Sequence, residues 1–305
     1  MRTITPQFTR ITDLTNTVGE TPVWSVADQA LTWINCEEEP EILRWHAATG
    51  AVQRWPMPER VGGFVFKQSG GALVVLANGL HDFDFATGKL TPRLASPLAP
   101  PVALHECGCD RQGRFWVGAI DKRVGPDNPF PGGAKVFRLD GDELVPMIEG
   151  YSCANGLAFS PDGRTLYTSD STTQRCDRYV LDPATGDISE RETFFQPDAG
   201  FVDGAAVDAE GGYWATLVYA GKLRRYLPDG TPDIEVVLPF ANPTKVAFGG
   251  KDMRTLFITS TAQGFSDEVN PLDGGLFAFE TEVAGRPDTM FAGMTNKGLF
   301  ESCRP

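Results

Sequence analysis

A short apolar stretch, a tight turn and a second apolar stretch recur along this sequence of 305 residues, and the repeat limits the folds open to it. The clearest copy runs over residues 154–170, where the turn reads Pro-Asp-Gly. Such a turn between two apolar runs is typical of a β-hairpin. Related copies lie at 105–116 and 203–214. We therefore expect a chain built from repeated β units.

The spacing of the repeat predicts its architecture. One turn residue follows each short strand, and successive turn residues are 42, 43, 50, 48 and 41 positions apart. These markers are Asp28, Gly70, Gly113, Gly163, Gly211 and Asp252. A period in the forties with several strands per unit is typical of a β-propeller. A second pattern, an apolar or aromatic pair before a turn, also recurs six times between 43 and 279.

We therefore predict an all-β fold, a six-bladed β-propeller that forms a single domain over residues 1–305. A closed ring needs its last blade completed by the N-terminal segment, because a sheet edge would otherwise stay exposed. The alternating segment 8–14 is the predicted closing strand. The tail after Gly285 is expected to supply the remainder of blade six.

Composition agrees with this fold and restricts the partners. Hydrophobic residues make up 41% of the chain, and 33 Gly with 23 Pro favour many short strands joined by turns. The net charge of −13 disfavours binding to nucleic acid or to an anionic membrane. No segment reads as an export signal or a membrane span, so a small-molecule partner and a cytoplasmic location are expected. The six cysteines are then expected to be free thiols.

Candidate site residues follow from the same markers, since equivalent positions of the innermost strands of a propeller form a ring around its channel. Counting eight residues back from each marker gives Glu20, Gly62, His105, Asn155, Asp203 and Thr244. Four of these can ligate a metal ion. Two carboxylates on a narrow axis repel each other, and a bound cation relieves that repulsion. The alternative is a polar, water-filled channel in which these side chains bond to one another. The predicted fold thus carries a metal site in its central channel.

Four motifs around these positions resemble the gluconolactonase and regucalcin (senescence marker protein) family of six-bladed propellers. They lie at Gly19–Trp24, Asn155–Gly163, Asp203–Gly204 and Pro243–Gly250. The resemblance spans essentially the whole chain. It implies a sugar lactone as substrate, and it implies that Glu20, Asn155 and Asp203 hold a single divalent metal ion.

Blade three departs from the family pattern. The family usually carries Arg-x-Asn-Asp-Gly there, with the Arg and Asn contacting the lactone, whereas this chain has Ala103 and His105 at those two positions. His105 is therefore open to three roles: a fourth metal ligand, a substrate contact or a general base. Glu106 is a further candidate substrate contact. Lys245 can meet an anionic group of the substrate or neutralise the carboxylates.

The function predicted from these residues is metal-dependent hydrolysis of a sugar lactone to the open-chain acid. The cation would bind the lactone carbonyl oxygen while Asp203 or His105 takes a proton from the attacking water. The identity of the metal, among Ca, Zn, Mn, Mg and Fe, stays open. Ca²⁺ prefers six to eight oxygen ligands, so ligation by His105 would favour Zn²⁺, Mn²⁺ or Fe²⁺. Two alternatives are a non-catalytic calcium- or ligand-binding propeller and a related esterase or organophosphate hydrolase.

Overall fold

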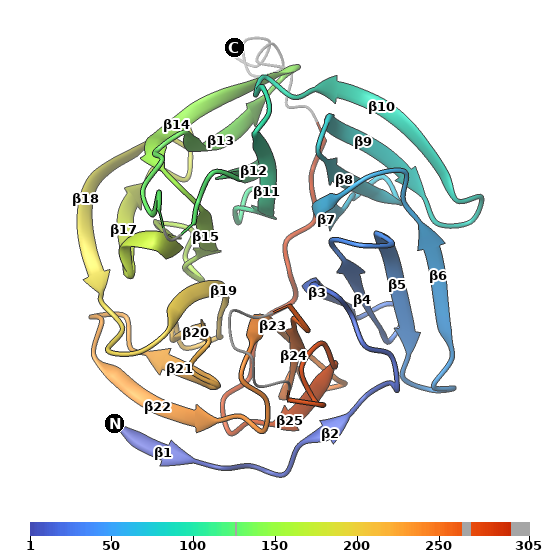
Figure 1. Ribbon diagram of the computed structural model, residues 1–305, viewed down its shortest axis with the longest axis vertical. Helices are drawn as coiled ribbons and strands as arrows, with labels where there is room; N and C mark the ends of the chain where they lie inside the picture. Colours follow the sequence, from blue (N-terminus) through green and yellow to red (C-terminus); the bar gives the residue numbers. More distant parts are fainter. Residues whose placement is uncertain (126, 264–269, 294–305) are drawn as a thin grey trace, which may run out of the picture.

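Six antiparallel blades surround a central axis in the computed structural model, which describes residues 1–125, 127–263 and 270–293 (Figure 1). Within each blade the chain moves outward from the axis, one strand after the next. This arrangement confirms the six-bladed β-propeller predicted from the spacing of the turns.

Blades one to three follow one another along the chain, each with four strands. Blade one contains β3 (Gly19–Ser25), β4 (Ala30–Asn35), β5 (Glu41–His46) and β6 (Val52–Pro56). Blade two contains β7 (Val61–Phe66), β8 (Ala72–Leu76), β9 (Gly79–Asp84) and β10 (Lys89–Ala95). Blade three contains β11 (Val102–Cys109), β12 (Phe115–Asp121), β13 (Ala134–Asp140) and β14 (Glu143–Tyr151).

Blade four again has four consecutive strands, whereas blades five and six each add one strand from the N-terminal segment. Blade four contains β15 (Ala154–Phe159), β16 (Thr165–Asp170), the 3₁₀ turn η1 (Ser171–Thr173), β17 (Arg175–Leu181) and β18 (Ile188–Phe195). Blade five contains β19 (Phe201–Val207), β20 (Tyr213–Val218), β21 (Lys222–Tyr226), β22 (Pro232–Val237) and β1 (Arg2–Ile4). Blade six contains β23 (Pro243–Gly249), β24 (Thr255–Ser260), β25 (Phe277–Glu280) and β2 (Thr9–Arg10).

The N-terminal segment closes the ring as predicted. β2 pairs antiparallel with β25 and becomes the outermost strand of blade six. The preceding strand β1 was not expected; it adds a fifth strand to blade five and runs parallel to β22. The two end strands therefore join blades five and six around the outside of the ring.

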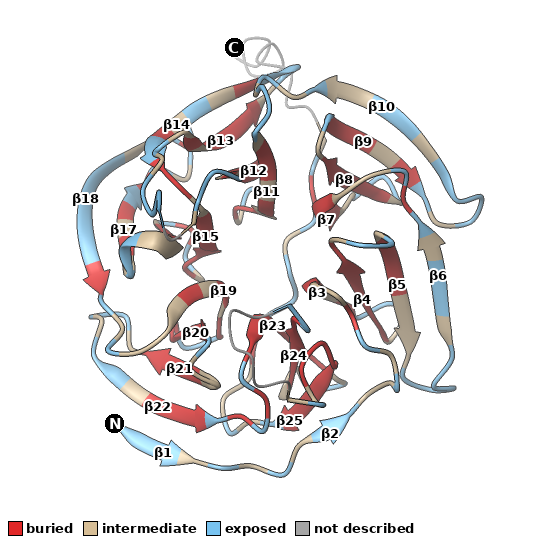
Figure 2. Ribbon diagram, in the orientation of Figure 1, coloured by how far each residue is buried: buried red, intermediate tan, exposed pale blue. Residues whose placement is uncertain are grey.

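Burial decreases from the axis to the rim (Figure 2). The inner strands β8 and β15 are buried at every position, whereas β18 on the rim is mostly exposed. Strands covered on both faces become continuous apolar runs, which explains why the repeat was visible as short apolar stretches. The five cysteines among the described residues are free thiols, as expected. The described part of the chain has no helix long and apolar enough to cross a membrane.

The repeats at 105–116 and 203–214 form the same buried turn in blades three and five. Asp208 Oδ1 accepts hydrogen bonds from the backbone N–H groups of Glu210 and Gly212, at 2.9 and 2.8 Å. Its Oδ2 accepts from Trp214 Nε1 at 2.8 Å. Asp110 likewise accepts from Trp116 Nε1. The repeated Asp therefore anchors the turn to the aromatic residue of the next strand.

The chain after Gly285 does not complete blade six, and this part of the sequence prediction is wrong for residues up to 293. The Gly285 N–H donates to the Met253 carbonyl of blade six, and the Phe291 N–H then donates to the Phe66 carbonyl of blade two. Residues 284–293, which we call the strap, thus cross the middle of the ring (Figure 1). They lie at the end of the channel where the inner strands finish, which we call its lower end. A repeat period reports neighbours within a blade, so it cannot reveal a segment that crosses the ring.

Candidate functional site

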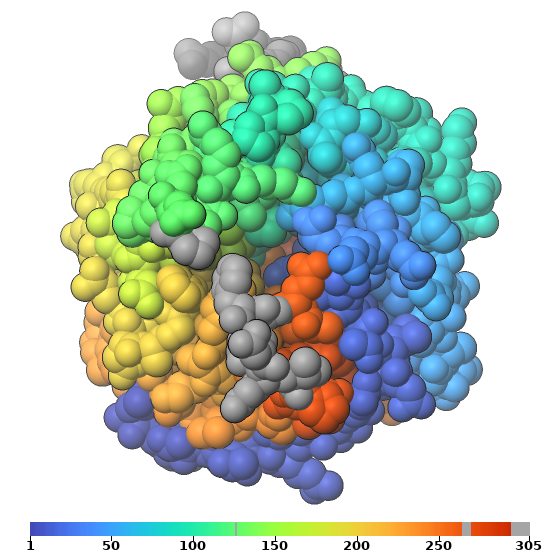
Figure 3. Space-filling view, in the orientation of Figure 1, coloured from blue at the N-terminus to red at the C-terminus, as the bar shows by residue number. Residues whose placement is uncertain are grey.

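The six positions predicted to face the axis lie at the opposite end of the channel from the strap, where the inner strands begin. We call Glu20, Gly62, His105, Asn155, Asp203 and Thr244 the rung. Figure 3 shows the face of the molecule at this end, with the loop after β12 beside a hollow near the axis.

An irregularity in strand pairing occurs beside the rung in every blade. The register shifts lie between Glu20 and Val23, Val61 and Gly63, Leu104 and Cys107, Asn155 and Ala158, Val202 and Ala205, and Pro243 and Val246. A β-bulge bends its strand and changes the direction of a side chain. The shared irregularity explains why one residue count locates equivalent positions in all six blades.

Glu20 and Asp203 are carboxylates held in a poorly solvated place. Burial raises the pKa of Glu20 to about 7; Lys245 opposes this shift and Glu106 adds to it. Burial also raises the pKa of Asp203 well above its usual range, and the nearby charges of Glu20 and Glu106 raise it further. One oxygen of Glu20 accepts a hydrogen bond from the Thr21 N–H at 2.9 Å. The two groups therefore repel each other as anions and would both gain from a bound cation.

The amide of Asn155 has a defined orientation. The Ser171 hydroxyl donates to the Val202 carbonyl at 2.7 Å, so its oxygen is left to accept from Asn155 Nδ2 at 2.9 Å. With the amide nitrogen directed to Ser171, the Oδ1 atom is available to the rung. Asn155 therefore presents an oxygen rather than an N–H group to a ligand on the axis.

His105 lies beside Asn155 and is bonded to an arginine of blade two. Arg60 Nη2 lies 2.9 Å from His105 Nδ1. Burial lowers the pKa of His105 well below its usual value, and the charges of Arg60 and Lys245 lower it further. The imidazole is therefore neutral around pH 7.

Glu106 and Lys245 form an ion pair beneath the rung. Lys245 Nζ lies 2.5 Å from Glu106 Oε1, and the other oxygen of Glu106 accepts from the Leu157 N–H at 2.8 Å. Only 9% of the lysine side chain and 3% of the glutamate side chain are exposed. Both charged groups thus have a partner within the protein, and a substrate contact by either residue stays a prediction.

Two rung positions carry no ligand group toward the axis. A Cβ atom at Gly62 would lie 2.9 Å from the His105 carbonyl oxygen and 2.8 Å from that of Leu104, so only glycine fits there. Thr244 donates its hydroxyl proton to the Gly19 carbonyl of blade one and so joins two blades. The rung positions whose side chains remain as candidate ligands are thus Glu20, His105, Asn155 and Asp203.

The donor set of Glu20, Asn155 and Asp203 is compatible with a divalent cation. It offers two carboxylates that repel each other and an amide oxygen whose orientation is fixed by Ser171. Hard divalent ions prefer oxygen donors of this kind. Within residues 1–125, 127–263 and 270–293, no cluster of three or more His, Cys, Asp and Glu side chains is arranged to hold a metal ion. The candidate set differs from such a cluster because its third member is an amide.

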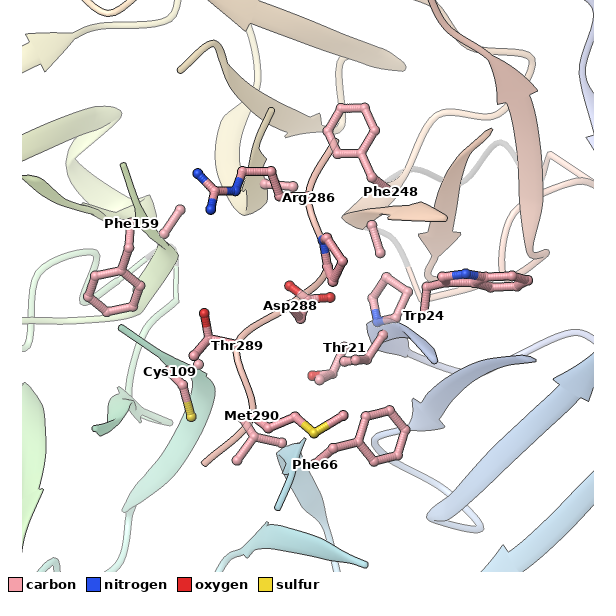
Figure 4. A pocket seen from close by; sticks show the side chains of 18 of the residues that line it. Thr21, Trp24, Phe66, Cys109, Phe159, Phe248, Arg286, Asp288, Thr289 and Met290 are labelled. Carbon is pink, nitrogen blue, oxygen red and sulfur yellow. The ribbon is translucent and has the colours of Figure 1, made fainter. Parts of the chain in front are cut away.

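A separate cavity of about 420 Å³ occupies the lower end of the channel. Its walls are largely apolar, and the strap passes through it, with Asp288 near the centre and Met290 against Phe66 (Figure 4). Lys245 contributes to its lining, whereas Glu20, Asn155 and Asp203 do not. The Glu106–Lys245 pair therefore separates this cavity from the rung.

The family model described as "SMP-30/Gluconolactonase/LRE-like region" matches residues 18–262, which include the whole rung. The chain belongs to this family. The resemblance inferred from the four sequence motifs is thereby confirmed.

Curated relatives and solved structures agree over nearly the whole chain. A 6-deoxy-6-sulfogluconolactonase from Pseudomonas putida is 36% identical over 90% of this chain and 95% of the relative. An L-arabinolactonase from Azospirillum brasilense is 32% identical over 94% of this chain and 96% of the relative. The crystal structure of a calcium-binding protein, regucalcin, from Agrobacterium tumefaciens is 25% identical, with a TM-score of 0.89, covering 95% of this chain and 99% of that one.

Sequence reasoning missed two residues that set the geometry of the site. Arg60 precedes its blade's rung position by two residues, and its contact with His105 joins positions 45 residues apart. Ser171 lies in η1, beyond the strand that follows Asn155. The glycine at rung position 62 was the one available signal, because a missing side chain leaves room for a group from elsewhere.

Proposed function

We propose that this protein hydrolyses a sugar lactone to its open-chain acid at the rung, with the help of one divalent metal ion. The observation that carries the proposal is that Glu20, Asn155 and Asp203 occupy equivalent positions of the innermost strands of three blades, beside the same irregularity in strand pairing. Membership of the gluconolactonase family and the lactonases among its relatives support the substrate class.

Glu20, Asn155 and Asp203 are the residues that would hold the metal ion. Such an ion, when bound, polarises the lactone carbonyl and stabilises the negative charge that develops on its oxygen. Asp203 would take a proton from the attacking water, and burial supports this role because it raises the pKa, and so the proton affinity, of the carboxylate. Glu20 shares the same poorly solvated place and supplies the second negative charge of the donor set.

A lactone panel tests the proposal. Lactones of five- and six-carbon sugars, including a six-carbon lactone with a sulfonate at C6, are incubated with the protein, and acid release is followed by a pH indicator. We expect rapid ring opening of at least one lactone, its loss after treatment with a chelator, and its return when a divalent metal is added. Activity that survives complete removal of metal would contradict the mechanism.

A calcium-binding role is the second candidate, because the regucalcin structure that covers this chain almost completely is described as a calcium-binding protein. The same panel separates the two functions. Calcium binding without turnover of any lactone would favour the binding role, whereas metal-restored turnover favours the enzyme.

A further inference from the structure

A single chain of hydrogen bonds runs through the candidate site and joins three blades. It starts at Glu37, whose carboxylate accepts from Arg60 Nε at 2.5 Å. It continues from Arg60 Nη2 to His105 Nδ1, where it ends. A separate pair of bonds runs from Asn155 Nδ2 to the Ser171 hydroxyl and from that hydroxyl to the Val202 carbonyl.

The groups at the ends of these two sets of bonds fix the direction of each bond. A guanidinium group has donors and no acceptor, so Arg60 donates and His105 Nδ1 accepts. A backbone carbonyl only accepts, so Ser171 donates to Val202 and accepts from Asn155 Nδ2. A neutral imidazole has one N–H group, and its Nδ1 accepts from Arg60, so the proton must lie on Nε2. The Nε2–H group is then the donor that His105 can offer to a ligand.

We propose that Arg60 is a positioning residue that holds His105 as the Nε2–H tautomer, so that His105 donates a hydrogen bond to an oxygen of the bound lactone. This role rests on the proposed lactone hydrolysis. The Nε2–H tautomer excludes two of the three roles that the sequence left open for His105. General-base catalysis and metal ligation both need a lone pair on a ring nitrogen. The lone pair of Nδ1 is engaged by Arg60, and Nε2 bears a proton.

Arg60 is built into the protein as a support for the imidazole. Only 8% of its side chain is exposed, and its third hydrogen bond, from Nη1, goes to the Leu104 carbonyl at 3.1 Å. Leu104 directly precedes His105, so the guanidinium is hydrogen-bonded both to the His105 ring and to the backbone next to that residue. Gly62 leaves this space free of a side chain. Glu37 balances the charge of the guanidinium.

Nitrogen NMR of the imidazole rings tests the tautomer directly. The chain has three histidines, His46, His81 and His105, so three ring signals are expected from ¹⁵N-labelled protein and the His105→Gln variant assigns one of them. We expect a protonated Nε2 and an unprotonated, hydrogen-bonded Nδ1 for His105, with the Nε2 proton retained when Zn²⁺ is added. A protonated Nδ1, or loss of the Nε2 proton on binding Zn²⁺, would overturn the proposal.

Removal of the guanidinium should release the tautomer. In Arg60→Met we expect His105 to show a mixture of both tautomers and kcat/KM for the lactone to fall about tenfold. Arg54→Met is the matched control, because Arg54 pairs with Glu41 on the rim and its side chain is 52% exposed. An unchanged His105 signal in a folded Arg60→Met protein would refute the role of Arg60. Unchanged His46 and His81 signals report that the variant is folded.

Two substitutions of His105 separate donation from base catalysis. Glutamine keeps an N–H group close to the position of Nε2, whereas asparagine keeps an acceptor close to Nδ1 and loses the donor. We expect His105→Gln to retain about tenfold more kcat/KM than His105→Asn. Equal and near-complete loss in both variants would indicate a base and contradict the proposal. If no lactone is turned over, the proposed function fails, while the NMR result still decides the tautomer.

Discussion

Replacement of Asp203 by asparagine is expected to lower kcat/KM for the lactone by about 10²–10⁴-fold, the usual contribution of a general base. Asparagine has nearly the same size and keeps one oxygen for a metal ion, but it cannot take a proton from water. It also removes one of the two negative charges of the donor set, so the metal concentration needed for half-maximal activity should rise.

The same substitution should leave the fold intact or stabilise it. Burial and the charges of Glu20 and Glu106 disfavour the ionised carboxylate of Asp203, so a neutral amide relieves an unfavourable interaction. Steady-state kinetics and urea unfolding of the same preparation check both effects. Asp198→Asn is the control, since Asp198 pairs with Arg224 outside the site and its side chain is 74% exposed. Wild-type kinetics in Asp203→Asn would show that the base lies elsewhere.

Replacement of Lys245 by methionine is expected to reduce the free energy of unfolding by about 3–5 kcal/mol. The substitution leaves Glu106 as a buried carboxylate without its cationic partner, and it removes the positive charge that most strongly lowers the pKa of Glu20. The cost of an uncompensated buried charge far exceeds the value of a surface ion pair. Urea unfolding followed by fluorescence measures the change.

Two further variants separate the ion pair from side-chain packing. Lys222→Met breaks a pair with Glu235 at 3.3 Å in which 31% of the lysine side chain is exposed, and it should cost less than about 1 kcal/mol. In the double variant Lys245→Met/Glu106→Gln, most of the lost stability should return, because no buried charge is left unpaired. A double variant less stable than Lys245→Met would contradict this explanation.

The fold was predictable because each blade repeats the same local pattern. Turn residues such as Gly113 and Gly163 follow a buried strand at a constant distance from the channel mouth, so one count located the rung in all six blades. The shared bulge keeps that count valid, because it falls beside the rung every time.

Contacts between blades were not predictable from the repeat. Arg60 reaches His105 across a blade boundary, and the strap passes from blade six to blade two. Both depend on side chains or segments that have no counterpart in the other blades. The Glu106–Lys245 pair has the same origin, since the two residues are 139 positions apart and meet only in the closed ring.

The most direct test of the central claim is a titration of metal-free protein with a divalent metal while lactone opening is recorded. The protein is first treated with chelator, and metal content and activity are then measured on the same samples. The account predicts that activity rises in proportion to bound metal and reaches its maximum at one ion per chain, with Asp203→Asn at least about 100-fold less active at the same occupancy. Full activity in the metal-free protein, or one bound ion per chain without any turnover, would contradict it.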